Sequence, residues 1–121
     1  MNPGAISSEL SALIDKISKD VAVVVEGKKD KAALEQLGIE SNKIYVLNKK
    51  PLFAVAEEIA VGCTEIVILT DLDAEGKKLY GKLYALLQSL GVKVDDRVRN
   101  FLFKNTKLRQ IEGITNLIQH E

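Results

Sequence analysis

The sequence predicts an α/β fold in which a single domain holds roughly four strands in a mainly parallel sheet, with helices on both faces. Two unbroken aliphatic runs, at 21–25 and 66–69, are typical of strands that are covered on both sides. Segments of helical length separate the predicted strands, as the crossovers of a parallel sheet require. The chain has 121 residues, 46% of them hydrophobic and 28% charged, which is typical of one globular domain with its own core.

The order of elements follows from residue spacing and from turn residues. Apolar residues from Ile6 to Ile17 recur at intervals of three and four, which predicts an amphipathic helix that packs on the rest of the chain. Glycines at 38, 62 and 91 end three later helices, and Pro51 suits a first helical turn. We predict strands over 21–25, 44–47, 66–69 and 97–103, and further helices over 28–37, 52–61, 77–90 and 108–118. An N-terminal packing helix then occupies 1–19, the central domain 20–103, and a C-terminal helix packed on that domain 104–121.

Acidic residues follow two of the predicted strands. Asp71 and Asp73 come just after the run at 66–69, and Glu26 directly follows the run at 21–25. The carboxyl ends of parallel strands meet at one edge of a sheet, so these acids could share one target. Carboxylates held close together repel each other, and Mg²⁺, which is commonly bound by one or two carboxylates, would relieve that repulsion. A pair of aspartates after a strand also fits a turn or a helix cap.

Composition limits the classes of function. The 17 basic and 17 acidic residues give zero net charge, which argues against a protein that coats nucleic acid through bulk charge. The one cysteine, Cys63, cannot form an internal disulfide. Since the sequence has neither a signal peptide nor a long apolar run, we expect a cytoplasmic protein without membrane contact.

The stretch from Val23 to Gly27, followed by the stretch from Ile68 to Gly76, resembles a Toprim domain, a Rossmann-like fold. The resemblance covers roughly 20–103, and the whole chain resembles small stand-alone Toprim proteins of archaea. Topoisomerases, bacterial-type primases, OLD-type nucleases and RecR share this domain. The resemblance implies that Glu26 is a general acid or base and a metal ligand, and that Asp71 and Asp73 hold one or two Mg²⁺ ions, with Mn²⁺ as a substitute.

Four further residues are candidates for the site. Gly27 and Gly76 belong to the motif and follow its acids at turns. Glu75 is either an additional ligand or an acid favoured at a helix start by the helix dipole. Glu112 lies in a segment that faintly resembles a motif of the nuclease that matures 5S ribosomal RNA, but it also suits a helix surface. Type IA topoisomerases carry a further acid where this chain has Lys77, so a second metal at that point is in doubt.

Basic residues are predicted near the same edge of the sheet. Lysines follow Glu26, the strand at 44–47 and the aspartate pair, and five basic residues lie between Arg97 and Arg109 without an acid. Together they favour a phosphate-binding rim, although any one of them could be an ordinary solvated side chain. The candidates are Lys28, Lys29, Lys49, Lys77, Arg97 and Arg99.

The leading functional hypothesis is a Mg²⁺-dependent protein that acts on nucleic-acid phosphodiesters, as a nuclease or as a DNA- or RNA-processing subunit. The rival is a module that binds metal, nucleic acid or a partner protein without turnover. The tyrosines do not suit a topoisomerase nucleophile, and the chain has no room for the extra modules of a primase. Receiver and haloacid-dehalogenase chemistry is less favoured, because receivers need two acids after the first strand and dehalogenases normally carry the aspartate pair there. A homodimer through a sheet edge or a helix is a further expectation.

Overall fold

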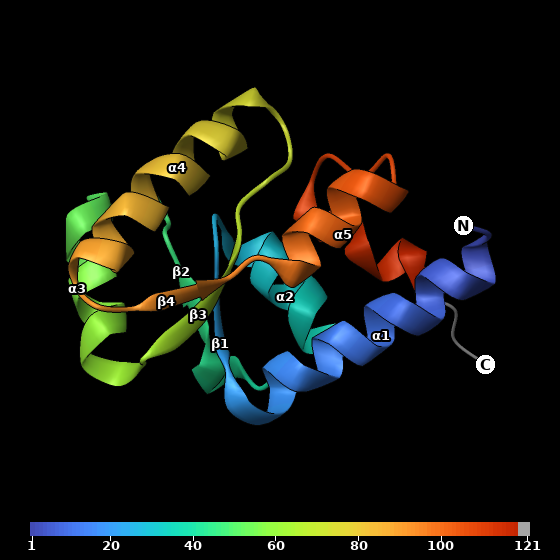
Figure 1. Cartoon of the computed structure of the whole chain (residues 1–121), viewed down its shortest axis with the longest axis horizontal. Helices are drawn as coiled ribbons and strands as arrows, with labels where there is room; N and C mark the ends of the chain where they lie inside the picture. The colour runs from blue at the N-terminus through green and yellow to red at the C-terminus, as the bar shows by residue number, and fades with distance from the viewer. Residues whose placement is uncertain (119–121) are drawn as a thin grey trace.

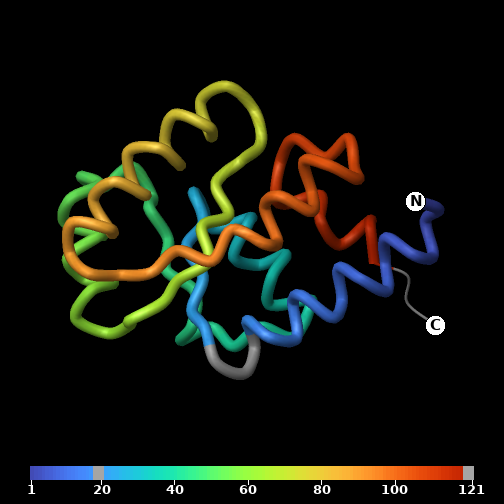
Figure 2. The backbone as a smooth tube through the Cα atoms, viewed as in Figure 1, coloured from blue at the N-terminus to red at the C-terminus, as the bar shows by residue number. Residues whose placement is uncertain are grey.

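The sheet contains parallel strands in the order β2-β1-β3-β4 (Figure 1). The computed structural model describes residues 1–118, apart from the side chains of residues 18–20. The two aliphatic runs form the two central strands, which lie side by side in the backbone trace of Figure 2. The predicted α/β class with a parallel sheet is therefore confirmed. The strands are β1 (Ala22–Val25), β2 (Ile44–Val46), β3 (Glu65–Leu69) and β4 (Lys93–Asp95).

Helices cover both faces of this sheet, as predicted. Within residues 1–118 they are α1 (Pro3–Asp20), α2 (Lys28–Gln36), α3 (Leu52–Gly62), α4 (Ala74–Ser89) and α5 (Arg97–Asn105), with short 3-10 helices η1 (Ser41–Lys43) and η2 (Ile111–Leu117). One face packs against α1, α2, α5 and η2, whereas α3 and α4 cover the other (Figure 1). No helix in the described part of the chain is long and apolar enough to cross a membrane.

Alternating side chains of the central strands divide the core between the two faces. Val23 and Val25 of β1, with Leu69 of β3, pack on the side of α1, α2 and α5. Val24 of β1 and Ile68 of β3 pack on the side of α3 and α4. All five side chains are at most 1% exposed, so these strands are covered on both faces. Polar chemistry is thereby left to the strand ends.

The predicted strand over 97–103 is wrong, because this segment forms α5. Its apolar residues Val98, Phe101 and Leu102 recur at helical spacing, and Val98 and Leu102 are buried in the core. The fourth strand is instead β4, a three-residue edge strand with only one apolar side chain. The predicted C-terminal helix is the 3-10 helix η2, and the part of that prediction over 119–121 lies outside the described residues.

The strand order reverses between β1 and β3. β2 lies on the outer side of β1, and β4 lies on the outer side of β3. In open α/β sheets, ligands bind outside the carboxyl ends of the strands at such a reversal point. Glu26 directly follows β1, and Asp71 lies two residues after the end of β3, so both acids stand at this point.

Candidate metal and phosphate site

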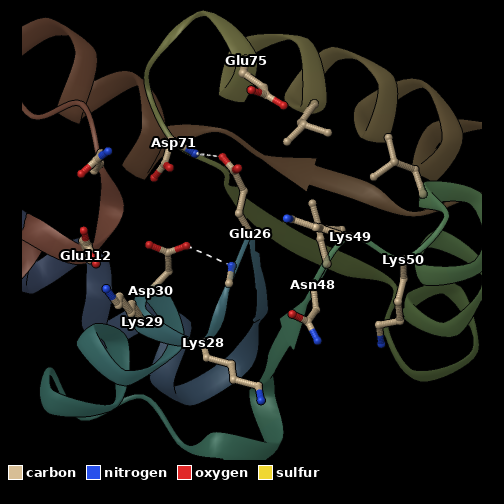
Figure 3. A pocket seen from close by; sticks show the side chains of 15 residues that line it. Glu26, Lys28, Lys29, Asp30, Asn48, Lys49, Lys50, Asp71, Glu75 and Glu112 are labelled. Atoms are coloured by element: carbon tan, nitrogen blue, oxygen red, sulfur yellow. Dashed lines mark hydrogen bonds between the residues drawn. The ribbon is translucent and has the colours of Figure 1, made fainter.

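The Glu26 side chain reaches from the end of β1 to the end of β3. Its Oε2 accepts a hydrogen bond of 2.7 Å from the backbone amide of Asp71, although the two residues are 45 positions apart (Figure 3). The parallel register causes this approach, because Val25 pairs with Leu69 and the two strand ends are level. The structure thus brings the glutamate and the first aspartate of the predicted site together.

The segment around η2 holds Asp71 from the opposite side. Asp71 Oδ1 accepts a hydrogen bond of 2.9 Å from the amide of Ile111. The next residue, Leu72, donates its amide to the carbonyl of Arg109 at 2.7 Å. Because the Asp71 carboxylate is anchored at one oxygen, its orientation depends on a segment 40 residues further along the chain.

Arg99 supports the end of β3 from within α5. Its guanidinium donates hydrogen bonds to the carbonyls of Thr70 and Asp71, and the side chain is only 3% exposed. It also lies over two aromatic rings, 4.6 Å from the centroid of Tyr80 and 5.5 Å from that of Phe103. β4 pairs only with the first three residues of β3, and Arg99 supplies donors to the carbonyls just beyond the end of β3. Arg99, predicted as a phosphate ligand, therefore positions the Asp71 backbone.

Asp73 has a defined structural role as the N-cap of α4. Its Oδ1 accepts a hydrogen bond of 2.8 Å from the amide of Gly76, so α4 begins at Ala74, three residues before the predicted start. Asp73 lines a neighbouring hollow together with Glu112, and not the cavity that contains Asp71. It is still close enough for its negative charge to act on Glu26.

Gly76 packs directly on the backbone of Asp71. A Cβ added at Gly76 would lie 1.9 Å from the Asp71 carbonyl oxygen, so only glycine fits there without movement of the backbone. The carbonyl of Gly76 accepts a hydrogen bond of 2.8 Å from the buried hydroxyl of Thr70. Gly76 therefore fixes the loop that carries Asp71. Gly27, the other motif glycine, is the N-cap residue of α2.

Asp30, a residue that the sequence analysis missed, adds another acid to the site. Its side chain is 7% exposed, and its Oδ2 accepts a hydrogen bond of 3.0 Å from the amide of Gly27 (Figure 3). Burial raises the pKa of Asp30, the Gly27 amide lowers it, and the charges of Asp71 and Glu112 raise it further. The available signal was its position at the third residue of α2, where an acid caps a helix.

The pKa of Glu26 is raised above its ordinary value of 4.5, mainly because burial removes water from its carboxylate. The hydrogen bond from the Asp71 amide lowers the pKa, while the charges of Asp71, Asp73 and Asp30 raise it. A carboxyl group whose pKa moves toward neutrality is better suited to accept and donate protons.

Lysines and acids line a shared cavity of about 670 Å³ at the strand ends. The sequence-predicted Lys28, Lys29 and Lys49 line it, and so does Glu75 from the first turn of α4. Two other predicted cations are elsewhere: Arg97 is paired with Asp95 at 2.7 Å, and Lys77 lies over the Phe103 ring, 5.0 Å from its centroid. The acids of the cavity are Glu26, Asp30, Asp71, Glu75 and Glu112.

The chemistry of this donor set suits a hard divalent cation. Within the described residues, neither Glu26 nor Asp71 forms a salt bridge. Among residues 1–118, no three His, Cys, Asp or Glu side chains are gathered as a complete metal site. Mg²⁺ commonly takes only one or two carboxylates and keeps several waters, and Glu26 with Asp71 meets that requirement.

Comparisons with known proteins agree with this geometry. The chain matches the Toprim domain over residues 21–101. It is 41% identical over 107 residues to a UPF0292 protein of Pyrococcus abyssi, with 88% of this chain and 79% of that protein covered. A UPF0292 protein of Methanosarcina barkeri is 35% identical over 111 residues, with 90% and 77% covered. A solved structure, a putative protein from Aquifex aeolicus, has a TM-score of 0.77 at 33% identity and covers 87% of this chain and 94% of its own.

The glutamate and aspartate motifs predicted a Toprim domain, and the match over residues 21–101 confirms that prediction. The archaeal relatives confirm the second part of that prediction, the likeness to small archaeal proteins with this domain. The chain belongs to the Toprim domain family, within the group of UPF0292 proteins.

Proposed function

We propose that this protein uses Mg²⁺, or Mn²⁺ in its place, to act on nucleic-acid phosphodiesters as a nuclease or as a DNA- or RNA-processing subunit. Toprim family membership supports a metal-dependent role related to nucleic acid. The observation that carries the proposal is the meeting of Glu26 and Asp71 in a cavity that lysines also line.

Each group of the cavity has a distinct role in the proposal. Glu26 and Asp71 would hold the metal ion, with Asp73 as a further ligand from the N-cap of α4. A bound Mg²⁺ would neutralise charge on the phosphoryl oxygens and activate water. Glu26, whose pKa is raised by burial, would move a proton during cleavage. Lys28, Lys29 and Lys49 would attract the phosphate backbone.

Metal-dependent cleavage tests the proposal directly. Structured RNA, single-stranded DNA and duplex DNA are incubated with the protein in Mg²⁺, in Mn²⁺ and in EDTA. We expect cleavage of at least one substrate only with metal, and its loss in Asp71→Asn and Glu26→Gln. Glu57→Gln is the matched control, because Glu57 is an exposed acid of α3 outside the cavity. Equal cleavage by all three variants would refute these roles.

A second candidate function is a binding module without turnover. The observation that favours it is the incomplete acid cluster: Asp73 caps α4, and no third carboxylate joins Glu26 and Asp71 at one point among the described residues. Such a module would bind nucleic acid or a partner protein in the presence of Mn²⁺ and cleave none of the three substrates. Glu26→Gln would then weaken Mn²⁺ binding in calorimetry with no cleavage to lose.

The predictions of a homodimer, a protein partner and a cytoplasmic location stay predictions. Sedimentation velocity over a hundredfold range of protein concentration checks the dimer. A single slow-moving species at every concentration would contradict it.

A further inference from the structure

The turn that follows β2 has a backbone conformation that its sequence disfavours. Asn48 has a φ of 47° and Lys49 a φ of 60°, and they are the only non-glycine residues with positive φ among those described. The amide of Lys50 donates to the carbonyl of Leu47 at 2.9 Å and closes a four-residue turn. Two successive positive φ angles are the pattern of a type I′ turn, in which Asn-Gly is favoured. Asparagine suits the first position, but a lysine in place of glycine at the second is strained.

Packing does not account for this strain. Lys49 is an exposed residue, and within the described residues it forms no salt bridge. A glycine would adopt the same turn at lower conformational cost, since it has no Cβ to clash with the backbone. Unusual backbone angles of this kind concentrate at functional sites, where the side chain is needed in that position.

The turn is attached to the backbone of Glu26 itself. The amide of Leu47 donates to the carbonyl of Val25 at 2.9 Å, and the amide of Asn48 donates to the carbonyl of Glu26 at 2.9 Å. These two bonds continue the β1–β2 pairing beyond the last residue of β2. The position of Lys49 is therefore set relative to Glu26, whose carboxylate is in turn held by the Asp71 amide.

The charges of the cavity give a second reason for cations in the turn after β2. In Figure 3, Asn48, Lys49 and Lys50 lie on one side of Glu26, with Asp30 and Glu112 on the other. A phosphodiester that approaches Glu26 brings its anionic oxygens toward a cluster of acids and is repelled unless cations stand beside them. Lys49 and Lys50 are the cations of the wall that is attached to Glu26.

We propose that the turn Leu47–Lys50 is a preformed phosphate-binding element of the cavity, and that Lys49 is kept in a strained conformation because its ammonium group binds a phosphodiester of a nucleic-acid strand. The inference rests on the proposed function and adds to it the element that determines affinity for the strand. It predicts a higher melting temperature but weaker binding of the strand for Lys49→Gly, because glycine relieves the backbone strain and lacks the ammonium that contacts the phosphate.

The test compares Lys49→Gly with Lys49→Ala. Binding of a fluorescein-labelled twelve-residue oligothymidylate is followed by fluorescence anisotropy in EDTA at low salt, and thermal unfolding is measured in the same buffer. Both variants lose one ammonium, so each should bind roughly fivefold to tenfold more weakly, with a salt dependence reduced by about 0.7 in log–log slope. Only Lys49→Gly relieves the strain, so it alone should melt about 2–6 °C above the wild type. Lys82→Ala removes an exposed lysine of α4 outside the cavity and should change affinity less than about twofold.

Three results would overturn the inference. Wild-type affinity in Lys49→Gly would show that the ammonium contacts no phosphate. A lower melting temperature in Lys49→Gly would show that the lysine stabilises the turn and is not strained. If the wild-type protein did not bind the oligonucleotide, a nucleic-acid strand would be excluded as the ligand of the turn. Because the assay contains no metal, binding that depends on Lys49 can be observed even where the cleavage assay finds no activity, so the two proposals fail separately.

Discussion

Gly76→Ala should destabilise this protein strongly, although alanine is normally the better residue in a helix. The added Cβ would lie 1.9 Å from the carbonyl oxygen of Asp71 and 2.5 Å from its carbonyl carbon. Both are backbone atoms, so no side-chain rotation can make room. The loop that carries Asp71, or the first turn of α4, has to move.

The size of the effect follows from the contacts that this movement disturbs. Overpacking costs about 1–3 kcal/mol. The cap from Asp73 to the Gly76 amide and the bond from the Thr70 hydroxyl to the Gly76 carbonyl are each worth about 1 kcal/mol. The better helix propensity of alanine returns about 1 kcal/mol. The net loss is about 2–4 kcal/mol, and at about 0.25 kcal/mol/K for a chain of this length the melting temperature falls by about 8–16 °C.

Gly81→Ala is the matched control on the same helix. Gly81 is exposed in the middle of α4, and a Cβ there would meet nothing within 4 Å. The same substitution should therefore stabilise the protein by about 0.5–1 kcal/mol, or about 2–4 °C. Differential scanning calorimetry measures both. Were Gly76→Ala to melt within about 2 °C of Gly81→Ala, the argument from close packing on Asp71 would be refuted.

Three further changes test the surroundings of the acids. Arg99→Lys should destabilise the protein by about 2–4 kcal/mol in urea unfolding, because one ammonium cannot replace two guanidinium bonds and two ring contacts. The exposed Arg97→Lys should have a much smaller effect, and equal effects of the two variants would contradict the role of Arg99. Asp30 has a raised pKa, so its contribution to stability is present at low pH and is lost as pH rises from its ordinary value of 3.8 through its folded pKa. Asp30→Asn should flatten this fall in urea titrations of the metal-free protein, and an unchanged pH dependence would count against it. Asp73→Ser keeps a capping oxygen, so the free energy of unfolding should change by less than about 0.5 kcal/mol. The same variant should bind Mn²⁺ about tenfold more weakly in calorimetry, and wild-type affinity would exclude Asp73 as a ligand.

The sequence was sufficient for the parts of the fold that depend on long apolar runs. β1 and β3 are buried on both faces, and their uninterrupted aliphatic runs are typical of such strands. β4 has a single apolar residue, Val94, so its three residues carry no strand signal of their own. Tertiary pairing with β3 makes it a strand, and the more apolar segment after it then forms α5. Val98 and Leu102, four residues apart, were the overlooked helical signal.

The site was predictable to a similar extent. Glu26 and Asp71 could be placed because each lies within two residues of the end of a recognisable strand. Asp30 could not, since its burial depends on η2 packing against α2, a contact between segments about 80 positions apart. The strained turn at Lys49 was also hidden, because a lysine in a loop gives no hint of a positive φ.

The adjacency of β1 and β3 also determines when the site can exist during folding. The segment that joins β1 to β3 contains α2, β2 and α3, with α2 on one face of the sheet and α3 on the other, so pairing β3 with β1 closes a long loop. Closing that long loop is among the slower steps for a small domain. A chain emerging from the ribosome therefore exposes Glu26 well before Asp71 arrives beside it. An incomplete polypeptide that ends before β3 contains Glu26 and Asp30 but lacks Asp71, Glu75 and Glu112, so the cavity with its full set of acids forms only in the finished domain.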